Sequence, residues 1–275
     1  MKKILVTGCS GYIGSHLCKM LKDQEYIVHG LDIVEPKVHI DDFYKLDINR
    51  PFNIEIEYDC VIHLAALVRV NEGEEKPIMY YITNVNGTMN VLSKITTDNF
   101  IFASTGAAEY ATSVYGMTKA MAEKIVSNYR TEQANRNYTI FRFYNVIGGD
   151  VVPPTNPDGL MYNLLRSLDT KQFTIHGNEY ETEDGTCVRD YVHVDEICES
   201  IISAIDKPSN DIECLGHGEG FSVKEMLEIF QAVNDVEIDI TYGPARSGDL
   251  PYTVLEEVSP YMVTKYSIAD LLFIE

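Results

Sequence analysis

The sequence contains no tryptophan, and positively charged side chains are scarce. Only 22 Lys and Arg residues stand against 42 Asp and Glu, which gives a formal net charge of −20. A field of that sign repels nucleic acid and anionic membrane surfaces, so neither is expected as a partner. If the ligand is an anionic small molecule, the site that binds it must carry cationic side chains of its own.

Long apolar runs and patterned cysteines are also missing. No apolar run approaches the roughly 18 residues that a membrane-spanning helix needs. Residues 1–3 lead at once into a strand-like segment, without the pattern of a secretory signal peptide. The six cysteines form no C-x-x-C pair and no cluster with zinc-ligand spacing. We therefore expect reduced, buried thiols, no metal site and a cytoplasmic protein.

Over the first 150 residues, short apolar runs alternate with segments of helical periodicity. Strands are expected at residues 3–7, 26–31, 60–66, 99–104 and 138–144, and helices at 13–24, 77–97 and 114–134. Strands that alternate with helices predict an α/β fold with a doubly wound (Rossmann) parallel sheet, covered by helices on both faces.

The composition and the regularity of the segments change after Gly148 and Gly149. Residues 152–157 read V-P-P-T-N-P, which is a loop by composition, and the later segments are shorter and less regular. We expect two domains: a dinucleotide-binding domain over residues 1–150, and a smaller C-terminal α/β substrate-binding lobe over 151–275. A segment near 188–206 is expected to return to the large domain.

A glycine-rich turn links the first expected strand to the first helix. Gly8 permits a tight turn, Gly11 lets the backbone approach a pyrophosphate, and Gly14 lets the helix pack closely on the strand. Asp32 ends the second strand, where a carboxylate can accept hydrogen bonds from ribose hydroxyls and would repel a 2′-phosphate. The pattern predicts binding of NAD rather than NADP.

Tyr115 and Lys119 share one face of the helix expected at 114–134, because they are four residues apart. A tyrosine with a pKa of about 10 is a poor base, but a neighbouring ammonium and a positive nicotinamide ring favour its phenolate. Such a tyrosine can take a hydroxyl proton. Ser104 and Thr105 end the preceding strand, where a hydroxyl can hydrogen-bond the reacting oxygen.

Several longer motifs carry a family resemblance. The stretches TGCSGYIGSH, HLAA, NVNGT, YGMTK and FRFYN, the segment TEDGTCVRDYVHV at 182–194 and the segment RSGDLP at 246–251 are all present. The chain resembles the extended short-chain dehydrogenase/reductases, that is, the NAD-dependent epimerase/dehydratase family, and within them the UDP-glucose 4-epimerases. The resemblance implies an isomerase that interconverts UDP-glucose and UDP-galactose through a 4-keto intermediate.

The resemblance also implies roles for individual residues. Thr105, Tyr115 and Lys119 would be catalytic. Besides the three glycines, Tyr115 and Lys119, the expected NAD contacts are Tyr12, Ile13, Asp32, Asp47, Ile48, Leu64, Ala65, Ala66, Asn84 and Tyr144. Besides Thr105 and Tyr115, the expected UDP-sugar contacts are Asn145, Leu160, Thr174, Ile175, His176, Arg189, Arg246 and Asp249. Arg189 and Arg246 meet the demand for cations at the site of an acidic protein.

Four features depart from the family pattern. Only ten positions separate Thr105 from Tyr115, and Val68 replaces a lysine that the family often has, with Arg69 beside it. The stretch between Asp32 and residue 47 is too short for the usual second helix, and the sequence ends early, without the usual final helices.

Other readings stay open. A nucleotide-sugar 4,6-dehydratase would need an acid/base pair where Gly106 and Ala107 follow Thr105, and a decarboxylase would need an acidic residue beside Thr105. A non-catalytic NAD-binding protein is a further alternative.

The resemblance bears on assembly and substrate range as well. It implies a homodimer built on the helices near 77–97 and 114–134, for which Ile78, Tyr81, Val85 and Met89 offer apolar surface. It also assigns to Thr253 a position that limits room around the sugar's 2-substituent. A threonine there predicts that N-acetylated sugars are accepted.

Overall fold

The computed structural model describes residues 1–132, 136–246 and 249–274, with the side chains of 130–132 excepted. The chain forms two compact units. Unit 1 comprises Met1–Phe143 and Cys198–Cys214, and unit 2 comprises Tyr144–Ile197 and Leu215–Glu275. Within the described ranges, no helix has both the length and the hydrophobicity needed to cross a membrane.

Unit 1 is built on a seven-stranded sheet. Its strands are β1 (Lys3–Thr7), β2 (Ile27–Asp32), β3 (Asp42–Lys45), β5 (Cys60–His63), β7 (Asn99–Thr105), β8 (Asn137–Phe143) and β12 (Ile212–Leu215), in the order β12-β8-β7-β5-β1-β2-β3. The pairs from β3 to β8 are all parallel. The chain order reverses on either side of β1, so ligands are expected at the carboxyl ends of β1 and its neighbours.

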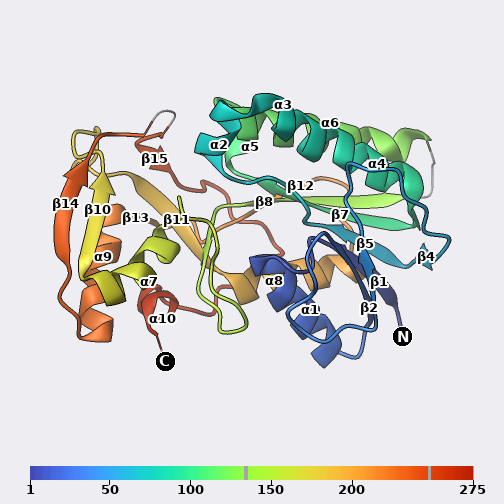
Figure 1. Cartoon of the computed structure of the whole chain (residues 1–275), viewed down its shortest axis with the longest axis horizontal. Coiled ribbons are helices and arrows are strands. Elements are labelled where there is room, and N and C mark those ends of the chain that lie inside the picture. The colour runs from blue at the N-terminus through green and yellow to red at the C-terminus, as the bar shows by residue number, and fades with distance from the viewer. Residues whose placement is uncertain (133–135, 247–248, 275) are drawn as a thin grey trace. The chain divides into compact units, whose positions relative to one another are not determined.

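Helices cover both faces of this sheet (Figure 1). They are α1 (Tyr12–Asp23), α2 (Val70–Glu75), α3 (Pro77–Tyr80), the π-helix η1 (Tyr81–Asn86), α4 (Gly87–Lys94), α5 (Ala107–Tyr110) and α6 (Val114–Glu132). Figure 1 shows α2 to α6 on one side of the sheet and α1 on the other. This arrangement is the doubly wound α/β fold that the alternating sequence pattern predicts.

The core of unit 1 lies between the sheet and α4 and α6. Buried Leu5, Val61, Phe100 and Phe102 from the strands pack with Val91, Ala122 and Val126 from the helices. The strands are buried on both faces, which explains why they read as continuous apolar runs rather than alternating ones.

Two of the expected boundaries differ from those in the described residues by more than one residue. The helical stretch from Pro77 ends at Lys94, because Thr96 and Thr97 form β6 and pair with β4 (Glu57–Tyr58). Strand β5 ends at His63 instead of residue 66, where the chain turns to pass the glycine loop. Residues 133–134 of the expected second long helix lie outside the described residues. No helix occurs between β2 and β3, as the short spacing indicates.

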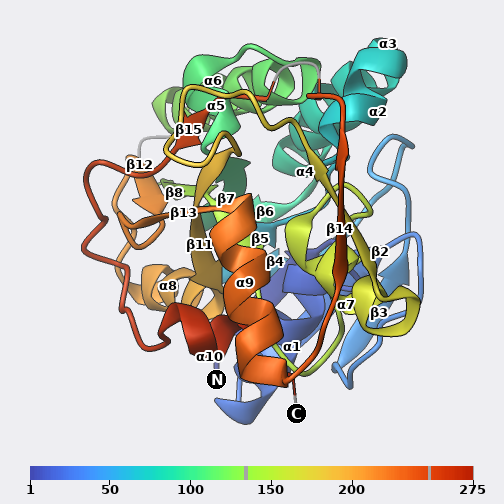
Figure 2. The same cartoon turned by 90° about the vertical axis from the view of Figure 1, so that its left-hand side faces the viewer.

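Unit 2 combines small sheets with helices. Its strands are β9 (Asn145–Ile147), β10 (Gln172–His176), β11 (Val188–His193), β13 (Gly220–Ser222), β14 (Asp239–Gly243) and β15 (Tyr252–Thr253). The helices are α7 (Leu160–Thr170), α9 (Val223–Asn234) and α10 (Ile268–Leu272), and α8 (Val194–Asp206) runs from unit 2 into unit 1. Figure 2 shows α9 beside α7 and α10.

The sheets of unit 2 share one apolar core. β10 pairs with β14, and β11 pairs with β9, β13 and β15. Leu164 of α7, Phe173 of β10, Tyr191 of β11, Phe230 of α9 and Leu272 of α10 are all buried in it. This core gives unit 2 its own stability, since each helix buries one apolar stripe against a sheet.

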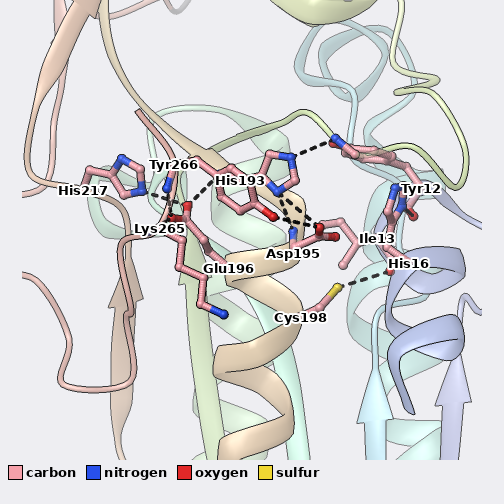
Figure 3. Close-up of polar contacts among 11 residues, drawn as sticks. Tyr12, Ile13, His16, His193, Asp195, Glu196, Cys198, His217, Lys265 and Tyr266 are labelled. Carbon is pink, nitrogen blue, oxygen red and sulfur yellow. Dashed lines mark hydrogen bonds and ion pairs between the residues drawn. The ribbon is translucent and has the colours of Figure 1, made fainter. Parts of the chain in front are cut away.

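A buried carboxylate organises one end of unit 2. Glu196, near the start of α8, accepts hydrogen bonds from the backbone N–H groups of His193 (3.0 Å), Lys265 (2.6 Å) and Tyr266 (3.2 Å). Its Oε2 also accepts a hydrogen bond from Nε2 of His217 at 2.8 Å. Figure 3 shows Glu196 at the centre of these groups. One side chain therefore ties the C-terminal segment and the 217 turn to α8.

Candidate active site

The loop between β1 and α1 has two positions where any side chain would clash with the backbone. Gly8 has a φ of +73°, and a Cβ there would lie 2.8 Å from the amide nitrogen of Ala65. A Cβ at Gly14 would lie 2.1 Å from the carbonyl oxygen of Gly8. Both positions therefore require glycine.

The start of α1 is suited to an anion. Gly11 is the N-cap residue and has no side chain to cap the helix. A helix start that no side chain caps can take an anion such as a pyrophosphate, which the helix dipole also favours. Tyr12 and Ile13, both expected to contact NAD, are the first two residues of this helix.

Asp32 ends β2 beside the glycine loop. Its Oδ2 accepts a hydrogen bond from the backbone N–H of Ser10 at 3.0 Å, and its Oδ1 accepts one from Val34 at 3.1 Å. Each carboxylate oxygen has a second lone pair, which can accept a ribose hydroxyl. The geometry fits NAD, because a 2′-phosphate would meet this negative charge.

The remaining expected cofactor contacts in unit 1 follow β3 and β5. Asp47 accepts the N–H of Asn49 at 2.9 Å, and Ile48 is buried in the core. Leu64, Ala65 and Ala66 form the turn after β5, where the N–H of Ala65 donates to Oγ1 of Thr7 at 3.3 Å. Tyr144 belongs to unit 2, where its N–H donates to the carbonyl of Leu215 at 3.1 Å.

Asn84 in η1 is buried, and its amide bonds the protein itself. The Oδ1 atom accepts the N–H of Leu67 at 2.8 Å, while Nδ2 donates to the carbonyl of Leu67 and to Oγ1 of Thr118, both at 3.0 Å. Asn84 thus fixes the turn after β5 against α6. Tyr80 holds the same turn, since its hydroxyl bonds both the N–H and the carbonyl of Arg69.

The structure brings Thr105, Tyr115 and Lys119 together in unit 1. Thr105 is the last residue of β7, and Tyr115 and Lys119 lie one turn apart at the start of α6. Tyr115 is half-buried, and burial raises the pKa of its hydroxyl to about 12, although a side-chain hydrogen bond with Thr105 acts in the opposite direction. A buried phenol needs nearby positive charge before it can act as a base.

Lys119 is the cation that the sequence predicts for this role, one helical turn after Tyr115. It is only 3% exposed, and its Nζ lies over the ring of Phe102, 4.1 Å from the centroid. Burial lowers the pKa of Lys119 to about 7, and the Glu123 carboxylate partly offsets that shift. A lysine with this pKa can exchange a proton at neutral pH.

Ser104 and Thr105 were both expected to offer a hydroxyl, and in the structure the two hydroxyls have different partners. The Ser104 hydroxyl is buried and donates to Oε1 of Glu123 at 2.5 Å, so it is committed inside the protein. Thr105 is the residue that hydrogen-bonds Tyr115. The sequence motifs did not single out Glu123. Its spacing of four residues from Lys119 was the only signal, and its burial is visible only in the structure.

His63 is a second buried polar residue that the motifs did not single out. Its Nδ1 lies 2.6 Å from Oγ1 of Thr7, and its Nε2 lies 3.0 Å from Oγ1 of Thr88. Thr88 donates its own proton to the carbonyl of Asn84, so it accepts from His63 and the ring carries its proton on Nε2. Burial lowers the pKa of His63 to about 3 and keeps it neutral.

Apart from Thr105 and Tyr115 of unit 1, the expected substrate contacts lie in unit 2. Nη1 of Arg189 donates to the carbonyls of Val188 (2.9 Å) and Leu250 (2.7 Å), and its Nη2 lies 3.6 Å from Oδ1 of Asp249. Arg246 donates to the carbonyl of Asp158 at 2.9 Å. The structure therefore brings Arg189 and Asp249 together, and a guanidinium has five N–H donors, more than these described bonds use.

The other expected substrate contacts are spread over three elements. Asn145 begins β9 and donates to the carbonyl of Asp190 at 3.1 Å. Leu160 is the first residue of α7, and Thr174, Ile175 and His176 follow one another on β10. Ile175 is buried in the core, so it supports β10, while its two neighbours are more exposed.

Comparisons with known proteins agree with this geometry. The model of the NAD dependent epimerase/dehydratase family matches residues 4–215. A UDP-glucose 4-epimerase from Lactobacillus helveticus is 33% identical over 291 residues, covering 90% of this chain and 86% of the relative. One from Bacillus subtilis (strain 168) is 31% identical over 293 residues, covering 90% of this chain and 86% of the relative.

Solved structures are similar over nearly the whole chain. A UDP-glucose 4-epimerase from Thermotoga maritima, solved with UDP-glucose, has a TM-score of 0.82 at 26% identity and covers 98% of this chain and 96% of its own. One from Brucella ovis, solved with NAD, has a TM-score of 0.84 at 25% identity, with 99% and 96% covered. The glycine loop, the Thr105–Tyr115–Lys119 set and these matches establish that the chain belongs to the NAD-dependent epimerase/dehydratase family.

Proposed function

We propose that this protein is an NAD-dependent epimerase that interconverts UDP-glucose and UDP-galactose at carbon 4 of the sugar. The observation that carries the proposal is the contact of Thr105 with Tyr115, one helical turn from the buried Lys119. The curated relatives and solved structures described above, which are named UDP-glucose 4-epimerases, support the same reaction.

The chain's own residues handle the proton in this reaction. Tyr115 takes the proton of the sugar's 4-hydroxyl, and the Thr105 hydroxyl holds that oxygen in line. Protonated Lys119 favours the phenolate of Tyr115, against the effect of burial. Bound NAD supplies the hydride acceptor and a positively charged ring. The 4-keto sugar then rotates within the site. Carbon 4 is reduced on its other face while Tyr115 returns the proton.

Cofactor binding is assigned to unit 1 and to Tyr144. In this proposal the pyrophosphate binds at Gly11 and the first turn of α1, and Asp32 accepts the adenosine ribose hydroxyls. The other proposed contacts are Gly8, Gly14, Tyr12, Ile13, Asp47, Ile48, Leu64, Ala65, Ala66, Asn84, Tyr115 and Lys119. Of these, Ile48 and Asn84 are buried and act chiefly by shaping the site.

Thr105 and Tyr115 are proposed to contact the sugar, and the other proposed substrate contacts are residues of unit 2. Arg189 and Arg246 are proposed to bind the diphosphate, because guanidinium groups match its planar, charged oxygens. They meet the need for local cations in a protein with a net charge of −20. Asn145, Leu160, Thr174, Ile175, His176 and Asp249 are proposed to line the uridine and sugar positions.

The open alternatives within the family fit the site less well. Gly106 and Ala107 follow Thr105, so the acid/base pair of a 4,6-dehydratase is missing there. The nearest following carboxylate, that of Glu109 on α5, is exposed. A non-catalytic NAD-binding protein would have no use for the buried Lys119 beside Tyr115.

Incubation with a panel of UDP-sugars and chromatography of the products tests the function. We expect UDP-galactose to form from UDP-glucose, and the reverse, without net change in bound NAD. Release of a 4-keto-6-deoxy sugar would instead indicate a dehydratase. Mass spectrometry of the denatured protein should find NAD as the main nucleotide, and NADP there would contradict the role of Asp32.

A homodimer is proposed as the assembly. Ile78 of α3, Ile82 of η1, Met89 of α4 and Met121 of α6 are all exposed, Ile78 by 70%. The first three, here called the apolar stripe together with Met121, lie along one continuous helical stretch from Pro77 to Lys94. Tyr81 and Val85 are half-buried beside that stripe. Apolar residues gathered on adjacent helices are typical of an interface.

A cytoplasmic location is proposed from the cysteines. All six are free thiols, and five of them are buried. Free thiols persist in reducing compartments.

A further inference from the structure

Glu123 is a buried charge that the proposed reaction does not use. It lies on α6, four residues after Lys119 and eight after Tyr115, so the three side chains share one face of the helix. Glu123 is only 3% exposed. A buried carboxylate is costly unless it is fully paired, so its partners indicate why it is there.

Those partners come from two neighbouring strands. The hydroxyl of Ser104 on β7 donates to Oε1 of Glu123 at 2.5 Å. Arg142 on β8 donates from Nε to Oε1 and from Nη2 to Oε2, both at 2.9 Å. Ser104 and Arg142 lie opposite each other in the β7–β8 pair. The carboxylate therefore fastens α6 to the carboxyl ends of two strands through charge-assisted bonds.

This anchor lies directly beside the reacting groups. Ser104 precedes Thr105, and the next amide, of Gly106, donates to the carbonyl of Phe143 on β8 at 3.0 Å. With Ser104 and Arg142 held by Glu123, the end of β7 is fixed relative to the helix that carries Tyr115. Without that hold, the ladder with β8 would still keep Thr105 in the sheet, but α6 would be held against the end of β7 chiefly by packing.

We propose that Glu123 is a positioning residue for catalysis, which acts through Ser104 to hold the Thr105 hydroxyl against Tyr115. The inference rests on the proposed epimerase function for its catalytic consequence. A displacement on the order of 1 Å at a reacting group can cost about 100-fold in rate, so a residue that prevents one has a measurable effect on turnover.

Three substitutions test the proposal in the full-length, NAD-loaded protein. Glu123→Gln keeps the shape of the side chain and removes its charge, and Ser104→Ala removes the link to β7 while leaving the Glu123–Arg142 pair. Glu109→Gln makes the same chemical change at an exposed position and is the matched control. We expect kcat with UDP-glucose to fall about 10- to 100-fold for the first two. KM and NAD content should stay within twofold, and the control should match wild type.

A double-mutant cycle distinguishes positioning from a general loss of structure. If Glu123 acts through Thr105, then Glu123→Gln should lower kcat by less than twofold once Thr105→Ala is present. Independent losses that multiply would overturn the proposal, and so would a kcat within twofold of wild type for Glu123→Gln. Should Glu123→Gln fail to fold, the same cycle with Ser104→Ala decides the question.

Hydrogen exchange decides it without turnover. The backbone amides of residues 104–110 should exchange faster in Glu123→Gln and Ser104→Ala than in wild type. In Glu109→Gln their exchange should be unchanged. A wild-type protein that does not epimerise any UDP-sugar would contradict the proposed function but not this anchor. Unchanged exchange in both variants would overturn the anchor whatever the activity.

Discussion

At the scale of single residues, Tyr115 is central to the proposed chemistry. Burial raises the pKa of its hydroxyl to about 12, so the residue is protonated at neutral pH until positive charge is close. Tyr115→Phe removes the base and keeps the ring that fills the site. We expect kcat to fall by about 10²- to 10⁴-fold, the usual range for loss of a general base, with NAD content unchanged. A coupled assay for UDP-galactose measures it, and residual turnover above a few per cent would contradict the assignment.

Thr253 decides the expected range of substrates. It lies opposite Arg189 in the parallel β11–β15 pair, so the two side chains share a face, while the adjacent Tyr252 is 52% exposed. We predict that the small threonine leaves room for a 2-acetamido group and that UDP-N-acetylglucosamine is therefore accepted. Thr253→Tyr should lower kcat/KM for the acetylated sugar about 10-fold or more relative to UDP-glucose.

The comparison needs a neighbouring control. Tyr252→Phe changes the adjacent residue and should leave the ratio of the two kcat/KM values as in wild type. A wild-type protein that rejects the acetylated sugar, or a ratio that Thr253→Tyr does not alter, would show that this position does not select the substrate.

At the scale of elements, the strand–helix alternation was sufficient to predict the fold of unit 1. Apolar runs and the glycine turn predicted β1, α1 and β2 to within a residue or so, because buried parallel strands and amphipathic helices leave strong local patterns. The edge strands β3 and β12 of the main sheet, the strand pair β4–β6 and the π-helical stretch from Tyr81 were not among the expected elements. The short strands depend on pairing with distant segments, which local periodicity does not record.

The same contrast holds for the candidate site. Gly8, Gly14, Tyr115 and Lys119 stand in short motifs, and the structure explains each by a close approach or a shared helix face. The network that supports them was not predictable, since Glu123 meets its partners on β7 and β8 only in the folded chain. In unit 2 the motifs pointed to Arg189 as a candidate contact. They did not predict that its guanidinium donates to the backbone carbonyls of Val188 and Leu250.

The link between Glu196 and His217 predicts how stability depends on pH. The hydrogen bond with Glu196 raises the pKa of His217 above 6.5. The pKa of Glu196 is lowered below 4.5, because its bonds with His217 and two backbone N–H groups outweigh burial. The contribution of His217 to the free energy of unfolding is complete below pH 6.5 and is lost as the pH rises through its raised pKa. The glutamate contribution is present above pH 4.5 and is lost in acid. The pair therefore stabilises the protein most between these values.

His217→Gln tests this link, because glutamine can still donate to Glu196 but carries no charge. We expect its Tm to lie a few degrees below that of wild type at about pH 5.5, and the gap to shrink at about pH 8.5. Asp190 accepts the N–H of His217, and that bond survives in the variant. A gap that is the same at both pH values would mean that the charge of His217 contributes nothing.

At the scale of the whole molecule, the acidic surface and the apolar stripe have different consequences. A net charge of −20 keeps copies of the chain apart unless an apolar contact offsets the repulsion. The exposed residues Ile78, Ile82, Met89 and Met121 offer that contact on adjacent helices of unit 1. Association should therefore become tighter as salt screens the repulsion, the reverse of an interface held by ion pairs.

The dimer itself is tested by placing a charge on that stripe. Light scattering should give wild type a mass near twice the 31.1 kDa of one chain. Ile78→Asp combined with Met89→Asp should shift the protein to a single-chain mass, because each carboxylate would be desolvated at the interface and face its symmetry copy. Val263→Asp adds the same charge at a 53% exposed residue of unit 2 and should leave the dimer intact. NAD content should not change in either variant, since the proposed cofactor contacts do not include the stripe. A wild-type mass near that of one chain, or a double variant that stays dimeric, would mean that these helices do not form the contact between subunits.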